Sequence, residues 1–264
     1  MNSVKRAKSS RIQRKNKRKI IFLDVSAEPL HNERYLQRGW FVMRRVFEEE
    51  LKSLHAHFLK MGVLVNEAIQ KSVDAFVTHD KELAQQVIDE DAAINALENE
   101  LELECFELIA LQQPVTTDLR KIVTVMKASA DLERIGDHAV SIAKSTIKVK
   151  GKKHDADIET AIAETALKVM GMVKEVLDAY VVLDVERARE IAARDTEIDA
   201  AAKNIYENCI EQMKQDPEII LGGTNYMRIS TYLERIGDYV TNISEWIIYL
   251  DSGEVVELNV HHKI

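Results

Sequence analysis

The six residues Leu132-Glu-Arg-Ile-Gly-Asp137 return unchanged as Leu233-Glu-Arg-Ile-Gly-Asp238, 101 positions further along the chain. Six identical residues recur by chance in a chain of this length with a probability on the order of 10⁻³, so the string marks an internal repeat. The match extends upstream, where Cys105 pairs with Cys209 at an offset of 104. A drift of three residues in the connection between two helices accounts for the change of offset.

Each repeat is predicted to form three helices. Asp80 and Asp184 suit the N-cap of each second helix. Pro114 and Pro217 follow that helix and interrupt it, because proline removes a hydrogen-bond donor and clashes with the preceding turn. The expected helices span 44–78, 80–112 and 115–149 in the first repeat, and 156–182, 184–215 and 219–250 in the second.

Apolar residues on the third helix of each repeat follow the 3-4 spacing of a helical-bundle seam. They are Val125, Ala128, Leu132, Ile135, Ala139 and Ile142, then Tyr226, Ile229, Leu233, Ile236, Val240 and Ile243. With 46% hydrophobic residues, 9 Gly and 3 Pro, the chain is neither disordered nor typical of a β-sandwich. The sequence therefore predicts an all-α fold of two tandem three-helix bundles.

The N-terminal 42 residues differ from the rest in charge. They carry 11 Lys and Arg against three acidic residues, whereas the other 222 residues carry 25 basic and 41 acidic ones. This extension is interpreted as an arm for nucleic acid or anionic lipid, as a targeting segment, or as sequence upstream of a native start at Met43. We favour the last, because the first convincing helix begins there, and expect no nucleic-acid partner. The predicted organisation is an extension (1–42), two repeats (43–150 and 155–251) and a tail (252–264).

Acidic residues on the second and third helices of each repeat are candidate metal ligands. Glu133 and Asp137 are four residues apart, on one side of the third helix, and the heptad register turns them away from the core. Asp91 and Asn95 lie on the flank of the second helix. The second repeat carries Asp195, Asp199, Glu234 and Asp238 at the corresponding positions. Carboxylates from two helices would give hard cations their oxygen ligands, and a solvated acidic face is the alternative.

The glycine and the arginine of the repeated string each have a structural and a functional interpretation. Gly136 and Gly237 stand in mid-helix, where glycine costs about 1 kcal/mol relative to alanine. This penalty indicates either tight helix packing or room for a ligand or partner. Arg134 and Arg235 are expected to pair with nearby acids, with an anion or partner contact as the second interpretation.

Signatures of catalysis are missing from the sequence. It contains no glycine-rich phosphate loop, nucleophile elbow, H-E-x-x-H motif or paired C-x-x-C. The two cysteines lie in helix-like segments and are interpreted as reduced core residues of a cytosolic protein. No stretch of 18 or more apolar residues is present. We predict a protein that is not an enzyme.

The twin strings, about 100 residues apart in a six-helix chain, resemble the PhoU family of phosphate-transport regulators between Met43 and Asp251. The surrounding residues add to the resemblance, with Asp118-Leu-Arg-Lys-Ile in the first repeat and Tyr239-Val-Thr-Asn-Ile243 in the second. The resemblance implies a cytoplasmic negative regulator of the phosphate-starvation response. Its implied partners are the ATPase subunit of the high-affinity phosphate ABC transporter and a sensor histidine kinase, so that it meets the membrane only through them.

The resemblance also implies metal clusters, because some family members bind iron or zinc through paired acidic motifs. Here the ligands would be Asp91, Glu133 and Asp137 in one repeat and Asp195, Asp199, Glu234 and Asp238 in the other, with Asn95 departing from the pattern. The alternative is a PhoU-like metal-binding module for another transporter or for metal homeostasis. Apolar seams of short bundles often continue into dimers, so we expect a homodimer.

Overall fold

The computed structural model describes residues 32–149 and 153–258, and the side chains of 44–148 and 153–258. The basic run between Lys5 and Lys19 lies outside the described residues. The chain divides into two compact units, Met1–Met43 and Arg44–Ile264. In the first unit the described residues are helical, and both three-helix repeats belong to the second unit.

The described residues form helices and no strand. The helices are α1 (Asn32–Thr78), α2 (Lys81–Gln112), α3 (Thr116–Val149), α4 (Ala156–Val182), α5 (Val185–Ala193), α6 (Asp195–Gln215), the short 3₁₀ helix η1 (Pro217–Ile219) and α7 (Ile220–Ser252). This confirms the predicted all-α fold, with α5 and α6 together taking the place of one expected helix.

Apart from shifts of one or two residues, the helices differ from the prediction in two places. The first helix begins at Asn32 rather than near residue 44, and no proline lies between these positions to interrupt it. The expected helix 184–215 is divided at Arg194, whose N–H donates to Ile191 O over 3.1 Å, while Glu197 N–H donates to Arg194 O over 2.9 Å. These bonds span three residues rather than four, which tightens the chain into a 3₁₀-like turn.

The two predicted N-cap residues cap their helices. Asp80 accepts a hydrogen bond from Leu83 N at 3.0 Å, and Asp184 accepts one from Arg187 N at 2.9 Å. Each therefore caps the second helix of its repeat, as predicted.

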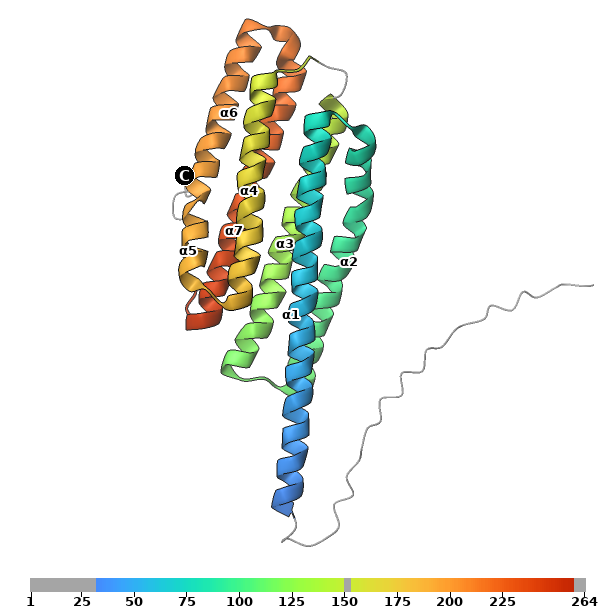
Figure 1. Cartoon of the computed structure of the whole chain (residues 1–264), viewed down its shortest axis with the longest axis vertical. Helices are drawn as coiled ribbons and strands as arrows, with labels where there is room; N and C mark the ends of the chain where they lie inside the picture. Colours follow the sequence, from blue (N-terminus) through green and yellow to red (C-terminus); the bar gives the residue numbers. More distant parts are fainter. Residues whose placement is uncertain (1–31, 150–152, 259–264) are drawn as a thin grey trace, which may run out of the picture. The chain divides into compact units, whose positions relative to one another are not determined.

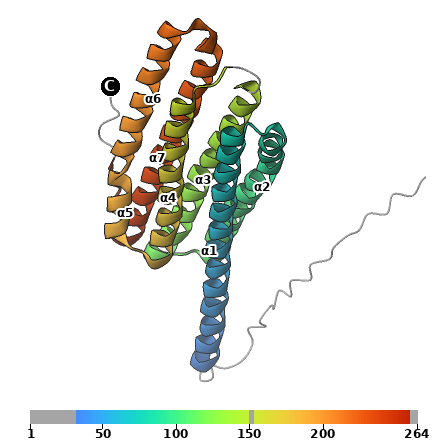
Figure 2. The same cartoon turned by 45° about the horizontal axis from the view of Figure 1, so that its top comes forward.

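The two third helices, α3 and α7, pack against each other at the centre of this unit, with α2 on α3 and with α4, α5 and α6 on α7 (Figures 1 and 2). Every predicted seam residue of α3 and α7 is at most 1% exposed. The first helices of the two repeats also meet, since the rings of Phe58 and Tyr180 pack edge to face with centroids 4.8 Å apart. Buried residues of both repeats form one continuous core, so the bundles lie side by side and share their interior.

A helix that spans a bilayer needs about 20 predominantly apolar residues. No helix in the described part of the chain is both long and apolar enough to cross a bilayer.

Candidate functional site

In the first repeat the candidate site forms where α2 crosses Gly136 of α3. A Cβ at this glycine would lie 3.3 Å from Ile94 Cδ1 and 3.9 Å from Asp91 Oδ1. The missing side chain thus lets α2 approach closely and brings Asp91 beside the repeated string. Of the two interpretations of this glycine, the structure shows tight helix packing. One of the residues packed against it, Asp91, is itself a candidate ligand.

The second repeat has the same arrangement, more tightly closed. Asp195 of α6 lies against Gly237, where a Cβ would overlap its Oδ1 atom. The Asp195 residue is only 2% exposed. The sequence placed this aspartate on the flank of the helix, where part of it would face solvent; because glycine lets the helices approach, that flank is buried.

The carboxylates around Gly136 influence one another. Burial, followed by the charge of Asp137, raises the pKa of Asp91 above its ordinary value. Burial also raises the pKa of Glu133, and the charges of Asp137, Glu98 and Asp91 add to it while Arg134 opposes them. Side chains from α2 and α3 thus form one negatively charged group, in which a bound cation would relieve repulsion.

Asp91 has one oxygen in use and one available. Its Oδ2 accepts a hydrogen bond from Asn95 Nδ2 at 3.0 Å. Its Oδ1 is buried and, like Asn95 Oδ1, has no hydrogen-bond partner among the described residues. These oxygens are of the kind that a cation accepts as ligands, so the donor set fits the implied metal in chemistry. As the side chains lie, however, this set does not converge into a compact ligand group.

A different group converges, and sequence reasoning missed it. Among the described residues, the three side chains of metal-ligand type with ligand atoms all within 4.8 Å of one another are His79, His154 and Glu159. No local motif marks the group, because His79 precedes His154 and Glu159 by 75 and 80 residues and meets them only when the repeats pack together.

The remaining acids and arginines of the second repeat lie near its string. Arg235 forms an ion pair with Asp238 over 3.2 Å, and its side chain is 58% exposed. Glu234 and Asp199 are half-buried, and each has a polar interaction within the chain. Arg134 is exposed on the corresponding face of α3.

His138 follows the first string but does not join the acidic group. Its ring stacks on Tyr232 and Tyr239 of α7, with each pair of centroids 5.7 Å apart. Burial lowers the pKa of His138, which favours the neutral ring. This histidine therefore packs in the interface between the repeats.

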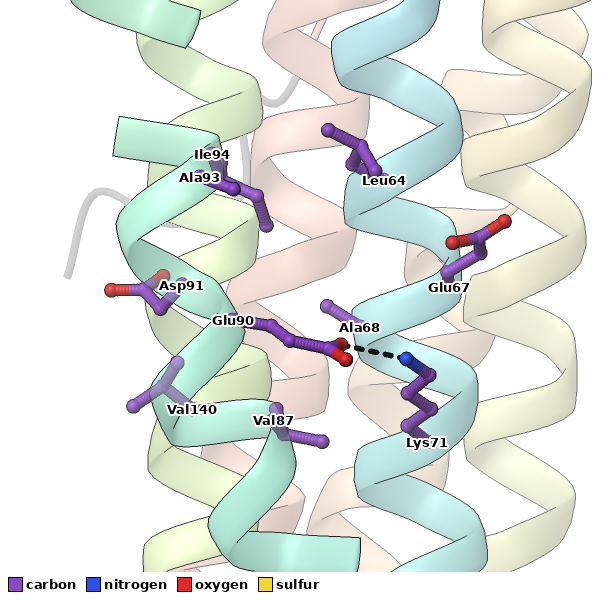
Figure 3. A pocket seen from close by; sticks show the side chains of 10 residues that line it. All are labelled: Leu64, Glu67, Ala68, Lys71, Val87, Glu90, Asp91, Ala93, Ile94 and Val140. Carbon is purple, nitrogen blue, oxygen red and sulfur yellow. Dashed lines mark hydrogen bonds and ion pairs between the residues drawn. The ribbon is translucent and has the colours of Figure 1, made fainter. Parts of the chain in front are cut away.

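A groove between α1 and α2 lies beside the first site. Lys71 and Glu90 form an ion pair of 2.6 Å across it, and Figure 3 shows Asp91 pointing to the other side of α2. In the second repeat, the residues 104 positions later are Glu175 and Arg194, which form a 3.1 Å ion pair with the charges exchanged. The two ion pairs thus occupy corresponding positions in the repeats but have opposite polarity.

The two cysteines occupy equivalent places in the repeats. Cys105 and Cys209 are free and fully buried. Burial raises their pKa values to about 12 and about 11. The predicted reduced core positions are confirmed.

Comparison with known proteins relates the chain to one family. The PhoU domain matches residues 58–146 and 162–247, one copy on each repeat. The phosphate-specific transport system accessory protein PhoU homolog of Clostridium acetobutylicum is 39% identical over 217 residues, which cover 82% of this chain and 99% of the relative.

Two solved structures have the same fold. The crystal structure of the phosphate transport system regulatory protein PhoU from Streptococcus pneumoniae superposes with a TM-score of 0.76 at 35% identity, covering 80% of this chain and 99% of that one. PhoU from Pseudomonas aeruginosa gives 0.75 at 35% identity, covering 79% and 100%. The family domain matches both repeats, the similarity covers nearly the whole length of these relatives, and the folds are the same. The chain therefore belongs to the PhoU family, a group of accessory regulatory proteins that are not enzymes.

Proposed function

We propose that this chain is a negative regulator of the phosphate-starvation response. It acts between the ATPase subunit of a high-affinity phosphate ABC transporter and a sensor histidine kinase, and restrains the kinase when phosphate is plentiful. The observation that carries the proposal is the match of both repeats to the PhoU domain, together with relatives named as accessory proteins of the phosphate-specific transport system. The function would place the chain in the cytoplasm.

We assign the partner contact to the outer faces of α3 and α7 around the repeated strings. Glu133 and Asp137 lie there with the exposed Arg134, and Arg235 and Asp238 lie at the corresponding place. A surface with charges of both signs favours a partner of complementary charge and fixes its orientation.

We further propose that the carboxylates beside Gly136 and Gly237 bind iron or zinc. The mutual raising of pKa values in the first group and the unpartnered Asp91 Oδ1 support a cation there. Asn95 contributes a neutral oxygen in place of the fourth carboxylate, which predicts a weaker first site than second. The second set is Asp195, Asp199, Glu234 and Asp238.

The chain is proposed to act as a homodimer. Leu103 and Phe106 on α2 are 62% and 51% exposed although large and apolar. Side chains three residues apart share a helix face, so these two are the proposed contact. Light scattering on the full chain would give the mass of a dimer, and that of a monomer for Phe106→Glu; an unchanged dimer in this variant would reject the proposed contact.

The regulatory proposal is tested with an alkaline phosphatase reporter in a deletion strain grown in high phosphate. The reporter should switch on, and the full chain should silence it. Truncations starting at residues 32 and 43 separate the basic extension from the first turns of α1, and both should silence the reporter if the extension is dispensable. A reporter that stays off in the deletion strain would reject the regulatory role and favour another transporter or metal homeostasis.

Two variants distinguish recognition of the partner from metal binding. Glu133→Lys and Glu234→Lys reverse a charge in each string, after which metal content and capture of the ATPase subunit are followed independently. Capture that survives the loss of metal would show that metal is not the recognition element.

A further inference from the structure

Three side chains meet where the two repeats join. His79 follows the C-terminal end of α1, His154 precedes α4, and Glu159 lies in the first turn of α4. These two helix ends lie at the same end of the second unit (Figures 1 and 2). The side chains are 32%, 29% and 15% exposed, so the group is sheltered but open to a solvent ion.

The ligand atoms of the three side chains all lie within 4.8 Å of one another, close to the spacing of a small coordination shell. His154 Nδ1 lies 2.9 Å from Glu159 Oε1, and His79 Nε2 lies 3.5 Å from Glu159 Oε2. Zinc–ligand bonds of 2.0–2.1 Å at tetrahedral angles place two ligand atoms roughly 3.3 Å apart. The imidazole rings are themselves close, with centroids 4.1 Å apart. Only small side-chain movements separate this group from a three-ligand site.

A buried tyrosine orients the carboxylate. Tyr226 O–H donates to Glu159 Oε1 over 2.7 Å and accepts a hydrogen bond from Asp155 N–H at 3.2 Å. Tyr226 is fully buried, and its ring packs edge-on against Phe76. The tyrosine leaves Oε2 facing His79, and such an outer hydrogen bond is the usual support of a metal ligand.

The turn that carries His79 does not itself require a histidine. Both His79 and its counterpart Leu183 adopt a left-handed backbone, with φ of 55° and 54°. The second repeat therefore makes the same turn with an apolar residue. The histidine is specific to the position where α1 meets α4.

We propose that His79 Nε2, His154 Nδ1 and Glu159 Oε2 bind a zinc ion, with water or an exogenous ligand in the fourth position. Two imidazoles and one carboxylate suit zinc and other late first-row divalent metals, whereas Mg²⁺ and Ca²⁺ prefer oxygen ligands alone. The site is distinct from the carboxylate groups beside Gly136 and Gly237. Bound zinc would tie the end of the first helix of one repeat to the start of the first helix of the other.

The test is a Zn²⁺ titration of the full-length, tag-free, metal-stripped chain against a chromophoric chelator, with Co²⁺ as a spectroscopic probe. All proteins carry His261→Ala and His262→Ala, so that the adjacent histidines of the tail cannot contribute. His154→Ala and Glu159→Gln should each lose one equivalent of Zn²⁺ and the tetrahedral Co²⁺ absorption. The control His57→Ala removes another half-buried His–Glu pair, His57–Glu104 at 2.9 Å, and should change neither.

Further variants separate this site from the others. Asp91→Asn with Asp137→Asn, and Glu234→Gln with Asp238→Asn, should retain the tetrahedral Co²⁺ signal. Tyr226→Phe should keep the stoichiometry but weaken Zn²⁺ binding about 10- to 100-fold, as loss of an outer-shell partner does. Circular dichroism of each metal-free variant checks that it is folded.

Two results would overturn the proposal. One is that the parent protein, with His79, His154 and Glu159 intact, binds no Zn²⁺ at micromolar concentration. The other is a folded His154→Ala or Glu159→Gln protein with the parent's stoichiometry and Co²⁺ spectrum. The isosteric Glu159→Gln variant keeps the test decisive if His154→Ala does not fold.

Discussion

The carboxylate of Asp195 on α6 packs against Gly237 on α7, in the space that a side chain at position 237 would occupy. The aspartate is 2% exposed, so its carboxylate is buried between the two helices. A glycine that lowers the helix propensity of α7 thereby makes room for a buried acidic side chain on a neighbouring helix.

Gly237→Ala should lower the free energy of unfolding by about 1–2 kcal/mol. A Cβ at this position would overlap Asp195 Oδ1, so the overpacking cost should be about 2–3 kcal/mol, the upper part of the usual range, and the gain of about 1 kcal/mol in helix propensity offsets part of it. Gly171→Ala on α4 is the matched control, because its nearest neighbour would be Glu175 Oε1 at 3.9 Å, and it should be stabilising. Urea unfolding measures the stability of both variants. An equal gain in stability in the two would show that the packing of Asp195 does not require a glycine at position 237.

The Lys71–Glu90 ion pair should contribute a coupling energy of about 0.2–1 kcal/mol in a double-mutant cycle, as half-exposed pairs do. Lys71→Glu alone should destabilise the chain by like-charge repulsion. Adding Glu90→Arg recreates the polarity of Glu175 and Arg194, and should restore stability to within about 0.5 kcal/mol of the parent. A double variant no more stable than Lys71→Glu would mean that the groove depends on Lys71 itself.

Asp91→Asn should make the protein more stable than its parent at pH 7. Burial and the charge of Asp137 raise the pKa of Asp91, so the folded state holds this proton more tightly than the unfolded chain. The contribution of this group is therefore full at low pH and is lost as the pH rises through the raised pKa. The advantage of the variant should shrink as the pH falls toward about 4, where the parent also becomes protonated.

Glu90→Gln serves as the control of opposite sign. The hydrogen bond from Lys71, with a second from Gln86, lowers the pKa of Glu90. The variant should therefore be less stable than its parent at pH 7, and this difference should also fade in acid. Thermal unfolding between pH 4 and pH 8 measures both, and variants that shift stability in the same direction would contradict the assignment.

Cys105 and Cys209 should resist alkylation by iodoacetamide at pH 8 in the native protein. Both thiols are buried, and burial raises their pKa values to about 12 and about 11, so few thiolates form and none is accessible. Labelling should be more than about 100-fold slower than in the urea-unfolded chain. Rapid labelling of one cysteine, located by mass spectrometry, would reveal local opening of that repeat.

The sequence predicted the helices and the seam because those depend on local periodicity and capping. Leu132 and Leu233 are buried where the 3-4 pattern placed them, and Asp80 and Asp184 cap the expected helices. The break at Arg194 was not predictable, because no proline or glycine marks it and it follows from a local change of hydrogen bonding.

The sequence predicted that acidic residues of the second helix lie beside the repeated strings, but not how deeply they are buried. Heptad positions give the direction of a side chain on an ideal helix, but they do not say how closely two helices approach. Close approach at Gly237 buried Asp195, which the pattern had placed on an outer flank. The meeting of His79 with His154 depends on how the repeats pack together, which neither repeat encodes alone.

The exchanged ion pairs bear on how a chain with two similar halves folds correctly. If α1 packed on α5 and α6 instead of on α2, Lys71 would face Arg194; if α4 packed on α2, Glu175 would face Glu90. Each mispairing sets like charges against each other, whereas each correct pairing joins opposite ones. The polarity of the two pairs therefore discriminates between helices of similar shape, and opposes the exchange of helices between repeats or between neighbouring molecules during synthesis.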